Sequence, residues 1–412
     1  MLERALRRES LASKIAACFL PFAAGYFLSY LYRTVNAVIG PHLIRDLGLD
    51  AGSLGLLTSA YFVTFAAIQL PLGILLDRFG PRRVEAVLLL CAAAGAIVFA
   101  LARDVVELTA GRALIGLGVS ACLMAAFKAN VQFWPSHRLA LANGFLLAFG
   151  GLGATVATLP VEWIVRTTDW RTLFLILAGA TVLVSILIWT AVPERAQGNG
   201  AGLREQIRGV GAILRSARFW LVAPVTVATQ ATYLAYQSLW AGPWLRNVAG
   251  MSGEAAASIL FLMAAAMIPG FAFGGLLADR LMRAGIRQDT LVLAFTGAFI
   301  AIQLPLVLNA VTGSGAVWVA FGLLGTGTVL GYACLTRQFP VDAAGRVNTA
   351  VNLLVFVGAF VAQAGIGAII DLFPETGAGY PPAGFQAGFG LVLAIQIAAW
   401  LWLAVRRRPG DA

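Results

Sequence analysis

Long apolar runs alternate with short polar segments along almost the whole chain. A helix that crosses a bilayer needs about 20 mostly apolar residues, and twelve runs are close to that length or longer. The pattern therefore predicts an all-α membrane protein with twelve transmembrane helices, numbered here as spans one to twelve. They lie at residues 15–40, 54–76, 84–102, 107–129, 141–164, 171–192, 219–240, 255–277, 289–308, 315–336, 347–370 and 386–405.

One long polar segment interrupts this pattern in the middle of the chain. Residues 193–218 are rich in glycine and arginine, and an amphipathic stretch around Leu203–Leu214 is expected to lie on the membrane surface. We predict that this segment is a cytoplasmic linker between two six-helix bundles, at residues 1–192 and 219–412.

The two predicted bundles share sequence motifs at a constant spacing. The stretch VIGPHLIRDLGL at 38–49 is echoed by WAGPWLRNVAGM at 240–251, which is 202 residues further on. The same spacing relates GILLDR at 73–78 to GLLADR at 275–280. Two motifs with one spacing indicate parallel repeats, so the halves are expected to be pseudo-symmetric.

Composition agrees with a membrane protein and argues against other classes. The chain is 60% hydrophobic and 12% charged, with a mean hydropathy of +0.84, whereas soluble proteins carry about 25% charged residues. The net charge of +10 comes from arginines in short loops, so we expect no nucleic-acid partner. Most of these arginines fall on the side of the two termini, which predicts cytoplasmic termini in a bacterial inner membrane.

The four cysteines lie inside apolar runs without the spacing of a metal site. Buried structural thiols are therefore expected, with no cofactor and no resident metal. His42 and His137 stand at loop edges, and no catalytic constellation accompanies them. We predict that the protein is not an enzyme.

Two motifs resemble those of a known family. PLGILLDRFGPRRV at 71–84 is similar to the signature loop of the major facilitator superfamily, although Pro81 stands where that family more often has a basic residue. GRALIGLG at 111–118 is similar to the family's span-four motif. The matching positions are Gly73, Leu75, Asp77, Arg78, Gly80, Arg82, Arg83, Arg112, Gly116 and Gly118. The resemblance implies a secondary transporter that moves a small molecule by rocker-switch alternating access.

The signature loop also suggests a gate. Gly73 permits close helix approach, and Asp77 at a helix end can accept hydrogen bonds or pair with arginine. We therefore predict a gating role for this cluster and its repeat, whereas Arg83 is expected only to set topology. The predicted gating residues are Gly73, Asp77, Arg78, Arg82, Asp279 and Arg280.

Polar side chains mark the spans that should face a central pathway. Spans three, six, nine and twelve are almost purely apolar and are expected to face lipid. In span one, Tyr30, Arg33 and Asn36 share one helical face. Arg112 is expected to bond backbone carbonyls or polar groups within its own half, in a structural or coupling role.

Arg33 has no predicted partner of opposite charge. All 19 acidic residues are expected in loops or at helix ends, and a buried charge without a partner is costly. We hypothesise that a small organic anion, most simply a carboxylate, is the partner, held bidentately. Ala235 occupies the repeat position of Arg33. The predicted substrate-binding residues are Arg33, Tyr30, Asn36, Tyr233, Gln237, Gln230, Asn352 and Lys128, although Lys128 could instead extend to the headgroups.

Several alternatives stay open. A proton-driven drug or metabolite exporter is one, although GFLLAFGGLGATVATLP at 144–160 lacks the Gly-Pro core typical of that class. A soft-metal importer using Met263 and Met267 is another, since thioethers spaced by four residues share a helix face. A non-transporting receptor is disfavoured by the short loops. A coupling proton could be carried by the substrate, by Glu162 or by Asp371, or could be absent, as in exchange or facilitation. The protein is expected to be a monomer.

Overall fold

The computed structural model describes residues 15–134, 136–193, 202–310, 314–340, 343–374 and 380–406, and within them it is all-helical. The helices before the linker are η1 (Ile15–Phe19), α3 (Leu20–Thr34), α4 (Asn36–Leu47), α5 (Ala51–Ala67), α6 (Gln69–Leu101), α7 (Val105–Val119), α8 (Cys122–Phe133), α9 (Ser136–Val156), α10 (Leu159–Thr167) and α11 (Trp170–Ala191). The linker contains α12 (Leu203–Leu214). The helices after it are α13 (Phe219–Ala235), η2 (Tyr236–Trp240), α14 (Ala241–Asn247), α15 (Gly253–Arg283), α16 (Gln288–Ala301), α17 (Leu304–Val307), α18 (Ala316–Gly325), η3 (Thr326–Val329), α19 (Leu330–Arg337), α20 (Ala344–Ile370) and α21 (Pro382–Arg406).

The prediction of an all-α membrane protein is confirmed. Among the described residues, nine helices are long and apolar enough to cross a membrane, or ten if the bent pair at 204–247 counts as one span. The other two predicted spans fall on shorter pieces. Span one is divided between α3 and α4, and span two begins with α5, which has 17 residues.

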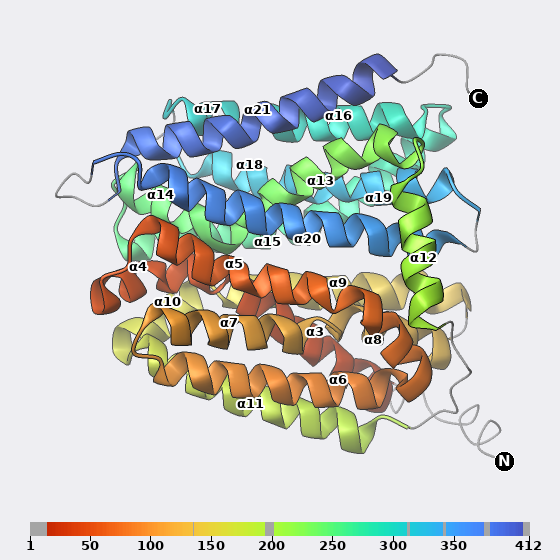
Figure 1. Cartoon of the computed structure of the whole chain (residues 1–412), viewed down its shortest axis with the longest axis horizontal. Helices are drawn as coiled ribbons and strands as arrows, with labels where there is room; N and C mark the ends of the chain where they lie inside the picture. Colours follow the sequence, from red (N-terminus) through yellow and green to blue (C-terminus); the bar gives the residue numbers. More distant parts are fainter. Residues whose placement is uncertain are drawn as a thin grey trace.

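The helices before and after α12 lie in two stacked groups in Figure 1. Helices α5 and α20 face each other where the groups meet, whereas α11 and α21 lie on opposite outer sides. This outer position agrees with the apolar sequences of spans six and twelve. We refer to the groups as the first half and the second half.

A sharp bend in α6 separates spans two and three. Gly80 has a φ of 79°, a conformation that disfavours any residue with a side chain. Pro81 follows, and its fixed φ suits the first position of the next helical segment. The Gly-Pro pair therefore ends one span and starts the next without a long loop.

Glycines of the span-four motif let α7 pack closely between two neighbours. A Cβ atom on Gly116 would lie 2.3 Å from the carbonyl oxygen of Tyr61, and one on Gly118 would lie 2.3 Å from the backbone nitrogen of Ala92. Such close backbone approach is how membrane helices gain packing energy without a hydrophobic driving force between them. The motif therefore holds α5, α6 and α7 together as a rigid unit.

The two halves touch where α4 meets α14, and we call this the α4–α14 end. A Cβ atom on Gly242 would lie 1.9 Å from the carbonyl oxygen of Ala37. Nearby, the Asp371 carboxylate accepts hydrogen bonds from the backbone N–H groups of Ala51 at 3.0 Å and Gly52 at 2.6 Å. These contacts run from the second half to the first, and they close this end of the structure.

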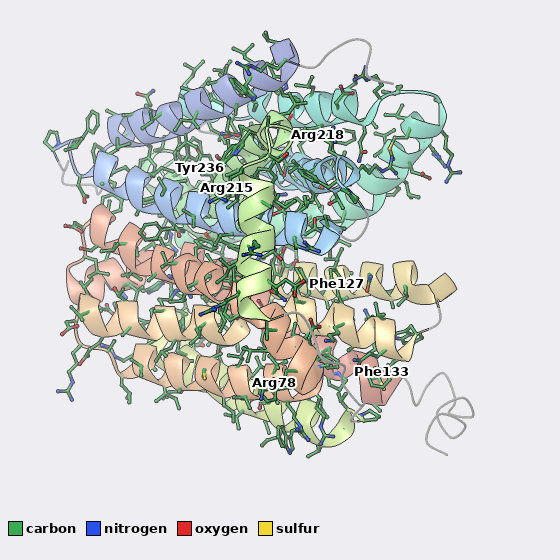
Figure 2. The ribbon with its side chains drawn as sticks, turned by 45° about the vertical axis from the view of Figure 1, so that its right-hand side comes forward. Arg78, Phe127, Phe133, Arg215, Arg218 and Tyr236 are labelled. Carbon is green, nitrogen blue, oxygen red and sulfur yellow. The ribbon has the colours of Figure 1, made fainter. Side chains whose placement is uncertain are left out.

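At the opposite end, α12 lies across both halves, as Figure 2 shows. Its axis is bent by 95° from the helical segment at 219–247, so it runs across the spans, as expected for a surface helix. It also contacts protein on both sides: Gln206 lies 3.2 Å from a Cβ position on Gly73, and Arg346 lies against Gly209. We call this the α12 end.

The contact at Gly242 predicts a shift in conformation when it is removed. Gly242→Ala should force α4 and α14 apart, because the added methyl group overlaps a backbone oxygen that cannot move independently. A reporter cysteine at Leu239, which packs against Gly40 at the same contact, should then react severalfold faster with a membrane-impermeant maleimide. Gly365→Ala, which meets no atom within 4 Å, is the matched control. An unchanged labelling rate in Gly242→Ala would contradict the assignment of this contact as the closure.

Candidate substrate site around Arg33

Arg33 lies at the end of α3 and is buried, with 6% of its surface exposed. Four aromatic rings surround its guanidinium group. The central carbon lies 4.6 Å from the ring centre of Tyr30, 5.3 Å from Phe65, 5.7 Å from Phe356 and 5.9 Å from Tyr61. Because Phe356 belongs to α20, the second half covers a charge that the first half supplies.

The rings do not replace an anionic partner. Each cation–π contact contributes about 0.5–2 kcal/mol and fades near 6 Å, whereas burying an ion costs several kcal/mol. In the described part of the chain, no carboxylate lies within ion-pair distance of Arg33, and its Nε atom has no hydrogen-bond partner. The arrangement is therefore a buried cation with unused donor capacity.

Tyrosines from the second half approach the same region. The hydroxyl group of Tyr332, in α19, lies in the neighbourhood of Arg33 and Tyr30, and it donates a 2.8 Å hydrogen bond to Asn352. Tyr233, in α13, lies in the neighbourhood of Tyr30. Its ring stacks on Phe321 and its hydroxyl group has no hydrogen-bond partner. Of these predicted residues, Tyr30 contacts Arg33 directly, whereas the binding roles of Tyr233 and Asn352 stay predictions.

Other predicted binding residues make contacts elsewhere. Asn36 donates a 2.9 Å hydrogen bond to Thr58 of α5. Gln237 donates to the sulfur of Met267 at 2.6 Å. Gln230 is buried in α13, and no described hydrogen bond or ion pair joins it to Arg33.

Lys128, predicted to bind substrate, pairs here with the signature loop. Its ammonium group donates to the Asp77 carboxylate at 2.6 Å and to the carbonyl oxygen of Leu76 at 2.7 Å. The physical reason is the bend at Gly80, which brings the end of span two beside α8. Lys128 therefore belongs to the signature-loop cluster.

The soft-metal alternative gains no support from the methionines. The Met267 sulfur already accepts a hydrogen bond from Gln237, and the Met263 backbone and side chain pack against Gly322. Both residues are buried at a helix contact, as expected for methionines that fill space.

The predicted gating residues form contacts within their own halves. Besides the Asp77–Lys128 pair, the Arg78 guanidinium lies 5.3 Å from the Phe79 ring and that of Arg82 lies 5.6 Å from the Trp189 ring. In the second half, Asp279 pairs with Arg283, whereas Arg280 is exposed. Gly73 lies against the linker, through Gln206.

Arg112 supports the Arg33 site from the first half. It donates a 2.8 Å hydrogen bond to the carbonyl oxygen of Tyr32, which is the contact within its own half that the sequence predicts. Its guanidinium also lies 5.2 Å from the Tyr61 ring. Tyr61 therefore stands between the two buried arginines and fixes their spacing.

Sequence reasoning missed Tyr61, Phe65, Phe356 and Tyr332. Three of them are typical of any apolar span, so nothing in their sequence context separates a ring beside Arg33 from one facing lipid. For Tyr332 the sequence contained a weak indication of a place near the pathway, since spans ten and eleven carry several polar residues.

The sequence places Glu85 near the end of a span, as the position of Pro81 confirms, but it does not predict that protein encloses this carboxyl group. This residue is fully buried within α6 and packs against Gly25 in α3 and Cys122 in α8. The sequence did not reveal the burial of Glu85, because the contacts that enclose it come from α3 and α8.

A polar cluster joins the halves at the α4–α14 end. The Glu162 carboxylate lies 3.4 Å from the Arg246 guanidinium and 4.0 Å from the His42 ring. Burial lowers the pKa of His42 below its ordinary value, helped by Arg45 and Arg246 and opposed by Glu162 and Asp46. The closed arrangement therefore favours neutral His42.

Comparisons with known proteins agree with this arrangement. The family model described as Major Facilitator Superfamily matches residues 22–363. The chain therefore belongs to the major facilitator superfamily and is a multi-pass membrane transporter.

Individual relatives carry more specific names. The chain is 26% identical over 273 residues to a probable sulfoacetate transporter of Cupriavidus necator, a match that spans 63% of each protein. It is 24% identical over 393 residues to the niacin transporter of Acinetobacter baylyi, covering 85% of this chain and 88% of that one. A crystal structure of a bacterial homolog of the human lysosomal transporter Spinster, inward-facing and unoccupied, is similar in fold, with a TM-score of 0.72, 19% identity and 96% coverage of each chain.

The His42 environment predicts that mild acid opens the α4–α14 end. The pKa of His42 is lower in the closed form than its ordinary value. Neutral His42 therefore stabilises the closed form above the ordinary pKa, and this stabilisation is lost as the pH falls below that value. The maleimide reaction of the Leu239→Cys reporter should accelerate on mild acidification, relative to the same reporter in His42→Asn. Asparagine is the control because it cannot take up a proton. Equal pH dependence in both proteins would show that His42 does not control this end.

Proposed function

We propose that the protein imports a small organic anion, most simply a carboxylate, in symport with protons across the bacterial inner membrane. The observation that carries this proposal is the buried Arg33 guanidinium, which has no carboxylate partner in the described structure. An anionic head group would accept paired hydrogen bonds from the guanidinium fork and supply the missing charge. Tyr30 and Tyr233 would flank it.

The relatives support this substrate class. Sulfoacetate and niacin, which appear in the names of two relatives, are both organic anions at neutral pH. Both are small, and each carries a planar carboxylate that suits bidentate recognition by arginine. The aromatic rings around Arg33 would pack against the organic part of such a solute.

The closed α4–α14 end supports an inward-facing assignment. The arginines of the signature loop and of α12 gather at the α12 end, which the positive-inside rule assigns to the cytoplasm together with both termini. The contacts of Gly242 and Asp371 then close the outer side. In the rocker-switch cycle, this conformation would release the anion toward the cytoplasm.

Proton coupling follows from the charge of the cargo. Moving one negative charge into a negative cell interior costs about 2.3 kcal/mol per 100 mV. A proton that accompanies the anion removes this cost and adds the pH gradient as a driving force. Import of an anion against the membrane potential is therefore most simply achieved by symport.

Substitution of Arg33 tests the proposal. Arg33→Ala should reduce uptake of the transported anion about a hundredfold, since removing one partner of a buried charge pair costs about 2–5 kcal/mol. Arg33→Lys should recover only part of the activity, because lysine keeps the charge but lacks the planar fork. The measurement is uptake of radiolabelled sulfoacetate and nicotinate into proteoliposomes with an acidic exterior.

The matched control is Arg103→Ala, which removes an exposed arginine elsewhere in the first half. Full uptake by Arg33→Ala would refute the binding role of Arg33. Accumulation that requires an acidic interior instead would favour a proton antiporter, the exporter alternative.

A further inference from the structure

Glu85 is a buried carboxyl group with no assigned role. It is 0% exposed, and neither carboxyl oxygen has a hydrogen-bond partner. The Cys122 thiol, a weak donor, is the polar group that faces it from α8. A carboxyl group buried in this way is unusual, because nearly all buried polar atoms in proteins are paired.

The backbone of α3 forms one wall of this site. A Cβ atom on Gly25 would lie 2.2 Å from the Glu85 Oε1 atom, so the absence of a side chain makes room for the carboxyl group. The next residue, Tyr26, packs edge-on against Tyr30 with ring centres 5.2 Å apart, and Tyr30 lies beneath the Arg33 guanidinium. One helix therefore connects the carboxyl group to the candidate substrate site.

Arg33, on α3, is close enough to influence the Cys122 thiol, whereas three cations on the other packed helices are engaged elsewhere. On α6 itself, the Arg82 guanidinium lies over the Trp189 ring of α11. Lys128, on α8, binds Asp77, and Arg112, on α7, binds the Tyr32 carbonyl oxygen. From α11, the Ser185 hydroxyl group donates to the Ala86 carbonyl oxygen. In the described part of the chain, no cation forms an ion pair with Glu85.

This environment favours the neutral carboxylic acid. An ionised carboxylate in an apolar interior without a partner is costly, and protonation removes that cost. A conformation that admits water to Glu85 would remove the preference. The proton occupancy of Glu85 would then follow the conformation of the protein, which is the property that a coupling site needs.

We propose that Glu85 binds the coupling proton. This inference rests on the proposed function, in which a proton accompanies the anion. The carboxylate takes up one proton to become a carboxylic acid and returns it to water later in the cycle, with no other bond made or broken. Gly25 and Arg33 are eight residues apart on α3, or about 12 Å along the helix, so one helix contacts both the proton site and the anion site.

Glu85 fits this role better than the two acids suggested by sequence. Glu162 pairs with Arg246, and Asp371 binds the N-terminus of α5, so both are engaged at the α4–α14 end. Glu85 is the acid whose neutral form the surrounding structure favours.

Chemical labelling of the unmodified protein tests the proton site without a known substrate. Dicyclohexylcarbodiimide reacts with protonated carboxyl groups in apolar surroundings, and peptide mass spectrometry locates the adduct. We expect Glu85 in vesicle-embedded protein to be labelled, with labelling that decreases severalfold as the pH rises from mildly acidic to alkaline. Glu107, which is exposed, should stay unlabelled. No adduct on Glu85 at any pH, or labelling independent of pH, would overturn the proposal.

Flux measurements separate this inference from the proposed function. With sulfoacetate or nicotinate as the probe, Glu85→Gln should retain counterflow exchange at equal pH but lose accumulation driven by a pH gradient. The wild type should accumulate the probe about tenfold per pH unit for one proton per anion, and Glu107→Gln is the control.

Each outcome has a distinct meaning. Accumulation by Glu85→Gln at the wild-type level would refute the role of Glu85 and leave the anion assignment intact. Uptake that does not depend on Arg33, together with pH-dependent labelling of Glu85, would refute the anion assignment and leave the proton site. If Glu85→Gln fails to fold, the pH dependence of labelling in the wild-type protein still tests whether Glu85 is the proton site.

Discussion

The arrangement of the candidate site depends on one buried positive charge. Arg33 is held among aromatic rings from both halves, and these rings stabilise a cation less than water or a carboxylate would. The first half supplies the charge and most of the rings, while α20 of the second half places Phe356 over them. Binding of an anion would therefore involve both halves, which is how a solute can influence their relative position.

The backbone framework around this charge is built from close helix contacts. Gly116 and Gly118 hold α7 against its neighbours, Arg112 bonds the carbonyl oxygen of Tyr32, and Gly242 lets the halves meet at the α4–α14 end. The contacts within the first half hold Arg33 in place. In the alternating-access cycle proposed above, the contacts between the halves would be the ones that break.

Much of this organisation was predictable from the sequence. The length of the apolar runs gave the helical membrane fold, the signature loop and the span-four motif indicated the family, and the unpaired Arg33 marked the site. The contacts of Lys128 and Asn36 were not predictable, because each is made to a residue of another helix, Asp77 or Thr58.

The burial of Glu85 was also not predictable from the sequence. Its neighbours in sequence, Arg82 and Arg83, are typical of a polar loop, and only the path of α3 past Gly25 encloses it. Helical periodicity describes one helix at a time, whereas burial of a single carboxyl group depends on how three helices meet. The aromatic rings around Arg33 were missed for this reason too, since phenylalanine is common on every face of a membrane helix.

The most direct test of the central claim is a structure of the protein with its transported anion bound. The account predicts that the anionic head group lies within hydrogen-bond distance of the Arg33 guanidinium, with Tyr30 and a residue of the second half also in contact. An anion bound elsewhere in the pathway, with Arg33 still unpaired among its rings, would contradict it.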